Sequence, residues 1–263
     1  MKLISIACLC LMSLFLLIAC GLSEEEQAEV NAQLIEAART GDMQNLKEAI
    51  DGKAQLDAVN EDGQSALYAA IARSDMDMVT LLLEEGASVS GSDQQAPPLL
   101  LMPAHNGHTP LLRLLIEKGA DPNEATGEGR TALMAAAAMG RPEAVRILLE
   151  HDADINAADE SGMTPLLAAC GGMASFELIE YLIENGANVN ASLAQRDYSP
   201  LMLAATEANR GSTRHMMIAQ MLTDSGADVN AIHANQRVTA LSFAARKGDV
   251  DLVELLLEHD AKP

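Results

Sequence analysis

Two apolar runs separated by a glycine recur along the chain. In residues 131–162, an alanine-rich run is followed by Gly140, a leucine-rich run and a polar segment. Apolar residues at helical spacing, punctuated by glycine, predict two short helices joined by a turn and followed by a polar hook. Residues 239–262 repeat the same plan near the other end of the sequence.

The repeat has a nearly fixed period, marked by an alanine shortly after each leucine-rich run. The marker alanines are separated by 33, 33, 33, 34, 40 and 34 residues, and they are Ala54, Ala87, Ala120, Ala153, Ala187, Ala227 and Ala261. A two-helix unit of this size cannot bury its apolar faces alone, so neighbouring units stabilise one another by stacking. Residues 31–263 are therefore expected to form one array of about seven units.

Helix start signals stand in the same register. Polar N-cap residues occur at Thr131, Thr164, Ser199 and Thr239, and Pro165 and Pro200 follow two of them at the first helical position, where a missing N–H costs nothing. Pieces of one motif recur as Thr164-Pro165-Leu166, Gly107-His108, Leu81-Leu82-Leu83, Gly119-Ala120-Asp121 and Asp228-Val229-Asn230. By these pieces the chain resembles the ankyrin-repeat family. The resemblance implies an all-α solenoid of helix-turn-helix units with β-turn hooks, which binds other proteins.

Two units depart from the pattern. The third has Pro103 inside its first helix, where proline removes a hydrogen bond and clashes with the preceding turn, so this helix is expected to be short or kinked. The sixth has six surplus residues between its helices, because Ser199 to Gly226 spans 27 positions against 21 in the regular unit from Thr131 to Asp152. We expect an outward loop at 206–215 that carries Arg210, Arg214 and His215.

The N-terminus reads as an export signal. Residues 1–19 combine one positive charge, an apolar run too short for a spanning helix and a small residue before Cys20. The end of this segment, Leu17-Ile18-Ala19-Cys20, resembles a bacterial lipobox, which implies lipidation of Cys20; an ordinary cleaved signal is the alternative. Residues 20–30 then form a short acidic tether, in which Ser23 and Glu26 fit a capping box.

Charge narrows the choice of partners. The chain has 17 Lys and Arg against 38 Asp and Glu, a net charge of −21. Such a surface repels nucleic acid and anionic lipid and favours a basic protein partner, so membrane contact is expected only through Cys20. The alternative is that the acidity only keeps a repeat protein soluble. We expect a monomer.

The sequence holds no recognisable catalytic or metal-binding constellation. Cys170 has no histidine in its unit to act as a base and reads as a small buried residue. His105 and His108 lack further ligands for zinc, and the methionines are too scattered for copper. We therefore expect no metal, no cofactor and no enzyme activity.

The family resemblance places protein-binding residues at hook tips and on the exposed face of each first helix. Carried onto this chain, the hook tips are Glu61, Asp62, Asp93, Glu128, Asp159, Glu160, Arg196, Asp197 and Tyr198. The helix-face positions are Tyr68, Arg73, Met134, Met139, Leu167, Met202, Glu207, Arg246 and Lys247. Arg210 and Arg214 join them from the sixth unit. The alternative is that the charged tips are solvated turns and that the methionines are core residues.

These observations predict an envelope lipoprotein that acts by stoichiometric protein binding. Gly21 follows the anchor where aspartate would favour inner-membrane retention, which by resemblance favours the periplasmic face of the outer membrane of a Gram-negative bacterium. Three roles compete. They are an immunity or inhibitor protein that neutralises a toxic periplasmic enzyme, an accessory or scaffold protein that supports a periplasmic enzyme such as a catalase, and, ranked last, an enzyme.

Overall fold

The computed structural model describes residues 22–90, 97–193, 198–206, 213–233 and 238–262. In these residues the regular structure is α-helical, with isolated β-bridges in the hooks, as between Ala125 and Thr131. The predicted all-α repeat fold is confirmed. The chain divides into two compact units, Met1–Ser88 and Val89–Pro263.

The described residues of the first compact unit form four helices. They are α2 (Glu24–Thr40), α3 (Met43–Asp51), α4 (Ala66–Ala72) and α5 (Met76–Glu84). Helix α2 packs against α3 and α4, and α4 packs against α5. The predicted capping box is present, because Ser23 Oγ accepts from Glu26 N at 3.3 Å and Glu26 Oε2 accepts from Ser23 N at 2.9 Å. Part of the segment assigned to the tether is thus helical, while the tether itself stays a prediction.

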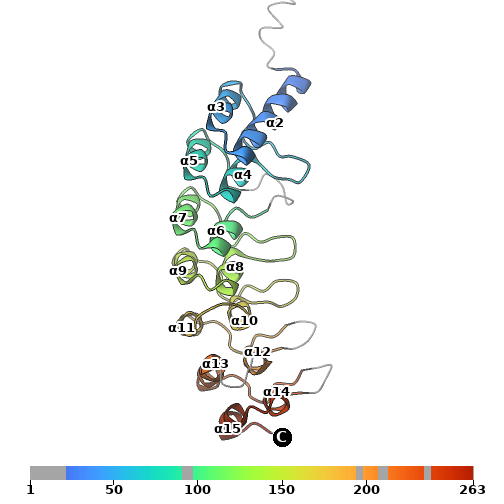
Figure 1. Ribbon diagram of the computed structural model, residues 1–263, viewed down its shortest axis with the longest axis vertical. Coiled ribbons are helices and arrows are strands. Elements are labelled where there is room, and N and C mark those ends of the chain that lie inside the picture. Colours follow the sequence, from blue (N-terminus) through green and yellow to red (C-terminus); the bar gives the residue numbers. More distant parts are fainter. Residues whose placement is uncertain (1–21, 91–96, 194–197, 207–212, 234–237, 263) are drawn as a thin grey trace, which may run out of the picture. The chain divides into compact units, whose positions relative to one another are not determined.

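The second unit stacks helix pairs in two layers (Figure 1). The first helices of its pairs are α6 (Leu101–Asn106), α8 (Ala132–Ala138), α10 (Pro165–Gly171), α12 (Pro200–Thr206) and α14 (Ala240–Lys247). The second helices are α7 (Thr109–Glu117), α9 (Pro142–Glu150), α11 (Phe176–Glu184), α13 (Thr213–Asp224) and α15 (Val250–Glu258). Each first helix contacts its partner and the next first helix. Among the second helices, α7 contacts α9, α11 contacts α13, and α13 contacts α15.

Local side-chain caps explain where these helices begin. Thr131 Oγ1 accepts from Met134 N and Thr164 Oγ1 accepts from Leu167 N, both at 3.3 Å. His108 caps α7 through Nδ1, which accepts from Leu111 N at 3.2 Å. Each cap satisfies one of the free N–H groups that a helix start leaves.

Proline shortens the first helix of the third repeat. Helix α6 has six residues, and Pro103 lies in its first turn, where no intrahelical N–H bond is needed. The predicted short helix is therefore confirmed.

The core follows from the alanine and leucine runs. Ala135, Ala136 and Ala137 of α8 are 2%, 0% and 0% exposed, so neighbouring first helices can approach closely. Cys170 is 1% exposed, and burial raises the pKa of its thiol to about 12, with the charge of Arg214 opposing the shift. The thiol therefore stays protonated at neutral pH and is a core residue, as predicted.

Asparagines at the base of the hooks join successive repeats. Asn156 Nδ2 donates to Gly186 O at 3.1 Å, while its Oδ1 accepts from Asn188 N at 2.8 Å. The same pair of hydrogen bonds recurs in three other repeats. We call Asn123, Asn156, Asn190 and Asn230 the asparagine ladder. Because each side chain bridges to the backbone of the following repeat, the ladder fixes the spacing of neighbouring hooks.

The sixth repeat differs from the sequence prediction. Arg214 and His215, which were expected in an outward loop, lie in α13, which has 12 residues where the other second helices have nine. His215 is 3% exposed, and its Nε2 lies 2.6 Å from Asp249 Oδ2. Arg214 Nη2 donates to Ala174 O at 2.8 Å. These contacts with neighbouring repeats hold both side chains inward, so the expectation of an exposed pair is wrong.

Candidate functional site

Two neighbouring hooks in the second unit are built around a turn with an internal side-chain cap. In the hook at 121–130, Thr126 Oγ1 accepts from Arg130 N at 3.1 Å. In the hook at 154–163, Asp159 Oδ1 accepts from Ser161 N at 2.9 Å and from Met163 N at 2.8 Å. A side chain that binds the backbone two to four residues ahead stabilises a tight turn. Asp159, which was predicted as a protein-binding residue, therefore also stabilises the turn of its hook.

The tips of these hooks are joined. Glu160 N donates to Glu128 O at 2.9 Å. Gly129 makes this contact possible, because its φ is +85° and a Cβ there would lie 3.1 Å from Asp159 Cα. The positive φ and the close approach both favour glycine. The side chains of Glu128 and Glu160 remain exposed beside each other's hook.

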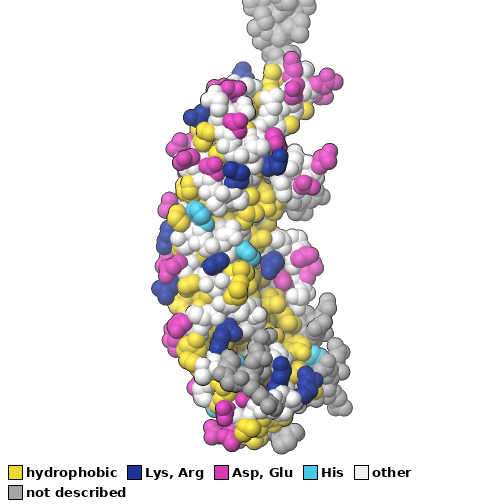
Figure 2. Space-filling model, viewed as in Figure 1, with side chains coloured by type: hydrophobic (Ala, Val, Ile, Leu, Met, Phe, Trp, Pro, Cys, Tyr) yellow, Lys and Arg dark blue, Asp and Glu magenta, His cyan; other side chains and the backbone are white. Residues whose placement is uncertain are grey.

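A groove of about 320 Å³ lies between these hooks and the first helices. Its hook side is formed by Glu128, Arg130, Asp159, Met163 and Leu193, and its helix side by Met134, Ala138, Leu167, Ala168, Gly171, Gly172 and Leu203. We call this the hook groove. Small residues on the helix side leave room, and the aliphatic and methionine side chains make the floor apolar. Figure 2 shows acidic side chains at hook tips along the right-hand edge of the view, with an apolar strip beside them.

The chemistry of the hook groove suits a protein segment. Ligand sites combine an apolar surface with a few placed polar groups, and a volume of about 300–1,000 Å³ is typical. Methionine side chains adapt to irregular apolar surfaces. Among the described residues that line the groove, the carboxylates of Glu128 and Asp159 outnumber the one guanidinium, that of Arg130. The groove can therefore take an apolar side chain that has a basic neighbour.

Comparison with known proteins assigns the chain to a family. The family model for ankyrin repeats (3 copies) matches residues 34–126, 100–193 and 173–263, which together cover most of the chain. The chain is an ankyrin-repeat protein. Ankyrin repeats generally mediate protein–protein interaction and are generally not enzymes.

The curated relatives share only the repeats. An ankyrin repeat-containing protein of Treponema pallidum (strain Nichols) is 38% identical over 87 residues, which are 33% of this chain and 27% of that protein. The ankyrin repeat and KH domain-containing protein mask of Drosophila melanogaster is 40% identical over 86 residues, 32% of this chain and 2% of that protein. Its Caenorhabditis elegans counterpart, mask-1, is 35% identical over 83 residues, 32% of this chain and 3% of that protein. The match thus spans a small part of each relative.

The hook groove gathers four of the predicted ankyrin hook and helix residues. Glu128, Met134, Leu167 and Asp159 line it, and Glu160 stands next to it through its bond to Glu128. The sequence did not single out several further groove residues, which are Arg130, Ala138, Met163, Ala168, Leu193 and Leu203. Arg130 and Met163 each directly precede a helix cap, Thr131 and Thr164, and this register position could have revealed them.

Three residues expected on the exposed face of a first helix are buried. Met134 is 2% exposed, and Leu167 and Met202 are each 0% exposed. Each is the third residue after its cap, and its backbone N–H donates to that cap. Because this turn is buried, neither methionine offers a free surface, although Met134 reaches the groove wall. Tyr198 packs edge-on to His233 at 4.7 Å and stacks with Phe243 at 5.7 Å, so its ring belongs to the core of its hook.

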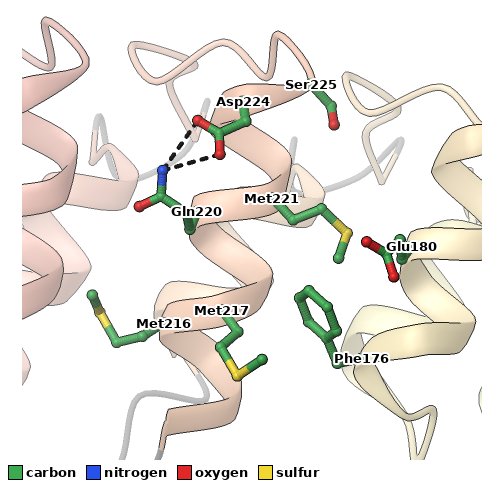
Figure 3. Close-up of a pocket in the computed structure, with 8 residues that line it drawn as sticks. All are labelled: Phe176, Glu180, Met216, Met217, Gln220, Met221, Asp224 and Ser225. Carbon is green, nitrogen blue, oxygen red and sulfur yellow. Dashed lines mark hydrogen bonds between the residues drawn. The ribbon is translucent and has the colours of Figure 1, made fainter.

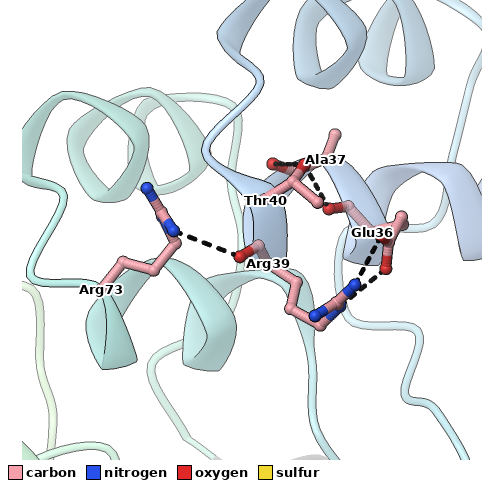
Figure 4. Close-up of polar contacts among 5 residues, drawn as sticks. All are labelled: Glu36, Ala37, Arg39, Thr40 and Arg73. Atoms are coloured by element: carbon pink, nitrogen blue, oxygen red, sulfur yellow. Dashed lines mark hydrogen bonds and ion pairs between the residues drawn. The ribbon is translucent and has the colours of Figure 1, made fainter.

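In the first unit, the predicted residues lie on a separate hook and helix. Glu61 and Asp62 are exposed at the hook tip, and Tyr68 is half-buried on α4. Arg73 is exposed, and its Nη1 donates to Arg39 O at 3.4 Å, at the end of α2 (Figure 4). Arg73 thus satisfies a carbonyl that the helix end leaves free.

The remaining predicted residues are dispersed. Met139 is half-buried at the end of α8, and Lys247 is exposed at the end of α14. The Arg246 guanidinium lies 5.1 Å from the ring centre of Phe243, a cation–π contact. Five predicted protein-binding residues fall outside the described residues, as does Cys20; they are Asp93, Arg196, Asp197, Glu207 and Arg210.

In the described part of the chain, no group of three or more His, Cys, Asp or Glu residues is placed to hold a metal ion. None of its helices is long and apolar enough to cross a membrane.

Proposed function

We propose that the chain binds a segment of a partner protein in the hook groove, in a stoichiometric and non-catalytic manner. The observation that carries this proposal is the gathering of Glu128, Asp159 and Met163 around one apolar groove between two joined hooks. Hooks joined at their tips present their side chains in a fixed geometry, which lowers the entropy lost on binding.

The partner segment is basic beside an apolar residue. Acidic side chains dominate the groove rim, and the whole chain has a net charge of −21. Complementary charge speeds association and selects the partner. Binding is therefore expected to weaken as salt rises.

Crosslinking from inside the groove tests this proposal. A photo-reactive residue is placed at Met163, which lines the groove, and in a second protein at Glu150, which is exposed on α9. Irradiation in the native cell is expected to capture one protein from the Met163 position and not from the Glu150 position. Equal capture from both positions would show that the groove has no special role.

Charge reversal then tests the captured partner. The double variant Glu128→Lys and Glu160→Lys changes two exposed tip residues and keeps the turn cap of Asp159. We expect the dissociation constant to rise by about fivefold or more, which corresponds to about 1 kcal/mol for two exposed charges. The control is Glu117→Lys, an exposed acid on α7. An equal loss in the control would mean that only net charge matters.

We also propose that lipidated Cys20 tethers the chain to the periplasmic face of an outer membrane. Support comes from the segment Leu17-Ile18-Ala19-Cys20, with Gly21 after it. Labelling cells with a radioactive fatty acid is expected to mark the wild-type chain, and Cys20→Ser is expected to remove both the label and the membrane association. A labelled Cys20→Ser chain would refute the tether.

Inhibition of a basic, toxic periplasmic enzyme is the second candidate role. The acidic hook tips favour it, because many exposed carboxylates can cover a basic active-site entrance. Cells that lack the protein should then die only when that enzyme is delivered. Normal growth on delivery would leave an accessory role, such as support of a periplasmic catalase, as the better interpretation.

A further inference from the structure

A second groove lies on the layer of second helices, away from the hooks. It has a volume of about 580 Å³ and runs along α13 beside α11. Met217 and Met221 of α13 and Phe176 and Glu180 of α11 line it, together with Gln220 and Asp224. We call it the helix groove. Figure 3 shows Met217 and Met221 directed toward Phe176 and Glu180.

The facing side chains follow helical spacing on both walls. Met217 and Met221 are four residues apart, as are Phe176 and Glu180, so each pair shares one face of its helix. Phe176 is half-buried, and Met217 is 47% exposed. The apolar surface of the groove is therefore open to solvent.

Met217 has no explanation in the packing of the repeat. It stands nine residues before Gly226, which ends its helix in the left-handed conformation. At the same position before their own left-handed residue, four other second helices carry an acid, which is Asp77, Glu143, Glu177 or Asp251. An acid there is solvated and favourable near a helix start. The sixth repeat thus has an exposed methionine at the position where four other second helices have an acid.

Acidic groups flank this apolar surface. Glu180 is exposed and forms no ion pair with another described residue. Asp224 is held in place by Gln220, whose Nε2 donates to both of its carboxylate oxygens at 3.0 and 3.1 Å, and His259 Nε2 lies 3.5 Å from Asp224 Oδ1. None of the described residues that line the groove is a lysine or an arginine. Its occupant therefore combines bulky apolar side chains with positive charge.

We propose that the helix groove binds an amphipathic helix of a partner protein, with leucine-like residues on one face and lysine or arginine beside them. Helices α11 and α13 form the two walls of the groove, and a partner helix can lie along it between them. The methionines suit this role, since methionine adapts to varied apolar side chains. Glu180 then meets a basic side chain at the rim. This site is separate from the hook groove, so the chain can hold two partner segments on opposite layers of the repeat.

The test uses a defined probe with the purified full-length chain. The probe is a synthetic helix of about 15 residues with leucines on one face and lysines elsewhere. Its controls replace the leucines by alanine, or the lysines by glutamate. Methyl groups of methionine are labelled with carbon-13 and followed by NMR during titration. The expected result is saturable binding that shifts Met217 and Met221 and leaves Met134 and Met202 unchanged.

Paired variants separate the groove from net charge. Met217→Glu restores the residue type of the other helices, and Met173→Glu adds the same charge at a methionine that is 66% exposed outside the groove. We expect Met217→Glu to weaken probe binding by about tenfold, and Met173→Glu to weaken it by less than about twofold.

Three outcomes would overturn the proposal. The first is probe binding that is equal in the two variants, or control peptides that bind as tightly as the probe. The second is a shift at Met134 or Met163, which places the probe in the hook groove and leaves the proposed function standing. The third is self-association of the chain that Met217→Glu abolishes in sedimentation, because the occupant is then a second copy of this chain.

Discussion

The asparagine ladder provides a direct test of how the repeats are held in register. Replacing Asn156 by alanine removes two hydrogen bonds, to Gly186 O and from Asn188 N. A typical hydrogen bond contributes about 1 kcal/mol, and exposed backbone groups regain water when the side chain is lost. We therefore expect the free energy of unfolding to fall by about 1–2 kcal/mol and Tm by about 5 °C.

Asn156→Asp separates the two bonds. The remaining carboxylate oxygen still accepts from Asn188 N, but the other oxygen now faces Gly186 O, which is also an acceptor. Stability should therefore fall by about 1 kcal/mol while the Asn188 amide stays protected. Urea unfolding measures the first effect, and hydrogen exchange at Asn188 measures the second.

If the ladder acts as described, the two variants differ in the rate of hydrogen exchange at the Asn188 amide. Asn156→Ala should speed exchange of the Asn188 amide by about tenfold, whereas Asn156→Asp should leave it nearly unchanged. Asn106→Ala is the control, because Asn106 is exposed and its side chain bonds to no other described residue. Equal exchange at Asn188 in wild type and Asn156→Ala would refute the proposed role of the ladder.

Three further predictions concern the core and the joined hooks. The pKa of the Cys170 thiol is about 12 in the folded chain against 9.0 ordinarily, so the free energy of unfolding should fall as pH rises from 9 towards 12. Cys170→Ala should remove up to about 1 kcal/mol of this loss by about pH 10, as measured in urea titrations. Gly129→Ala should cost about 1–2 kcal/mol in the same assay, because φ is +85° and the new Cβ meets Asp159. Phe243→Ala should cost about 3–5 kcal/mol, because the ring is 2% exposed and stacks with Tyr198.

Each of these predictions has a matched control. A pH slope that Cys170→Ala leaves unchanged would mean that other groups cause the alkaline loss. Gly127→Ala should stay within about 0.5 kcal/mol of wild type, because a Cβ there meets no atom within 4 Å. Val250 is 63% exposed, so Val250→Ala should also have little effect, and a loss as large as that of Phe243→Ala would contradict the burial argument.

The sequence predicted the fold well because each repeat is specified locally. The caps at Thr131 and Thr164 and the short helix at Pro103 all depend on neighbours within a few residues. Such contacts repeat with the period of the chain, so a pattern in the sequence is enough to find them.

The site was predicted less completely because it depends on distant contacts. Arg214 reads as an exposed loop residue until Ala174, 40 residues away, is placed next to it. Met134 reads as an exposed helix residue until the hooks are built over it. Likewise, Met217 and Phe176 meet across two repeats, and no local pattern marks that pair.

The ladder also shows how this chain tolerates unequal repeats. Asn190 bonds to Gly226, 36 residues on, whereas Asn156 bonds to Gly186, 30 residues on, and both bonds have nearly the same length, 3.2 and 3.1 Å. The six added residues leave the junction between hooks unchanged, since it is formed at the base of the hook and not along the helix pair. Residues can therefore be added between α12 and α13 without disturbing the asparagine ladder. Over evolution, a new binding surface could arise there while the rest of the stack stays as it is.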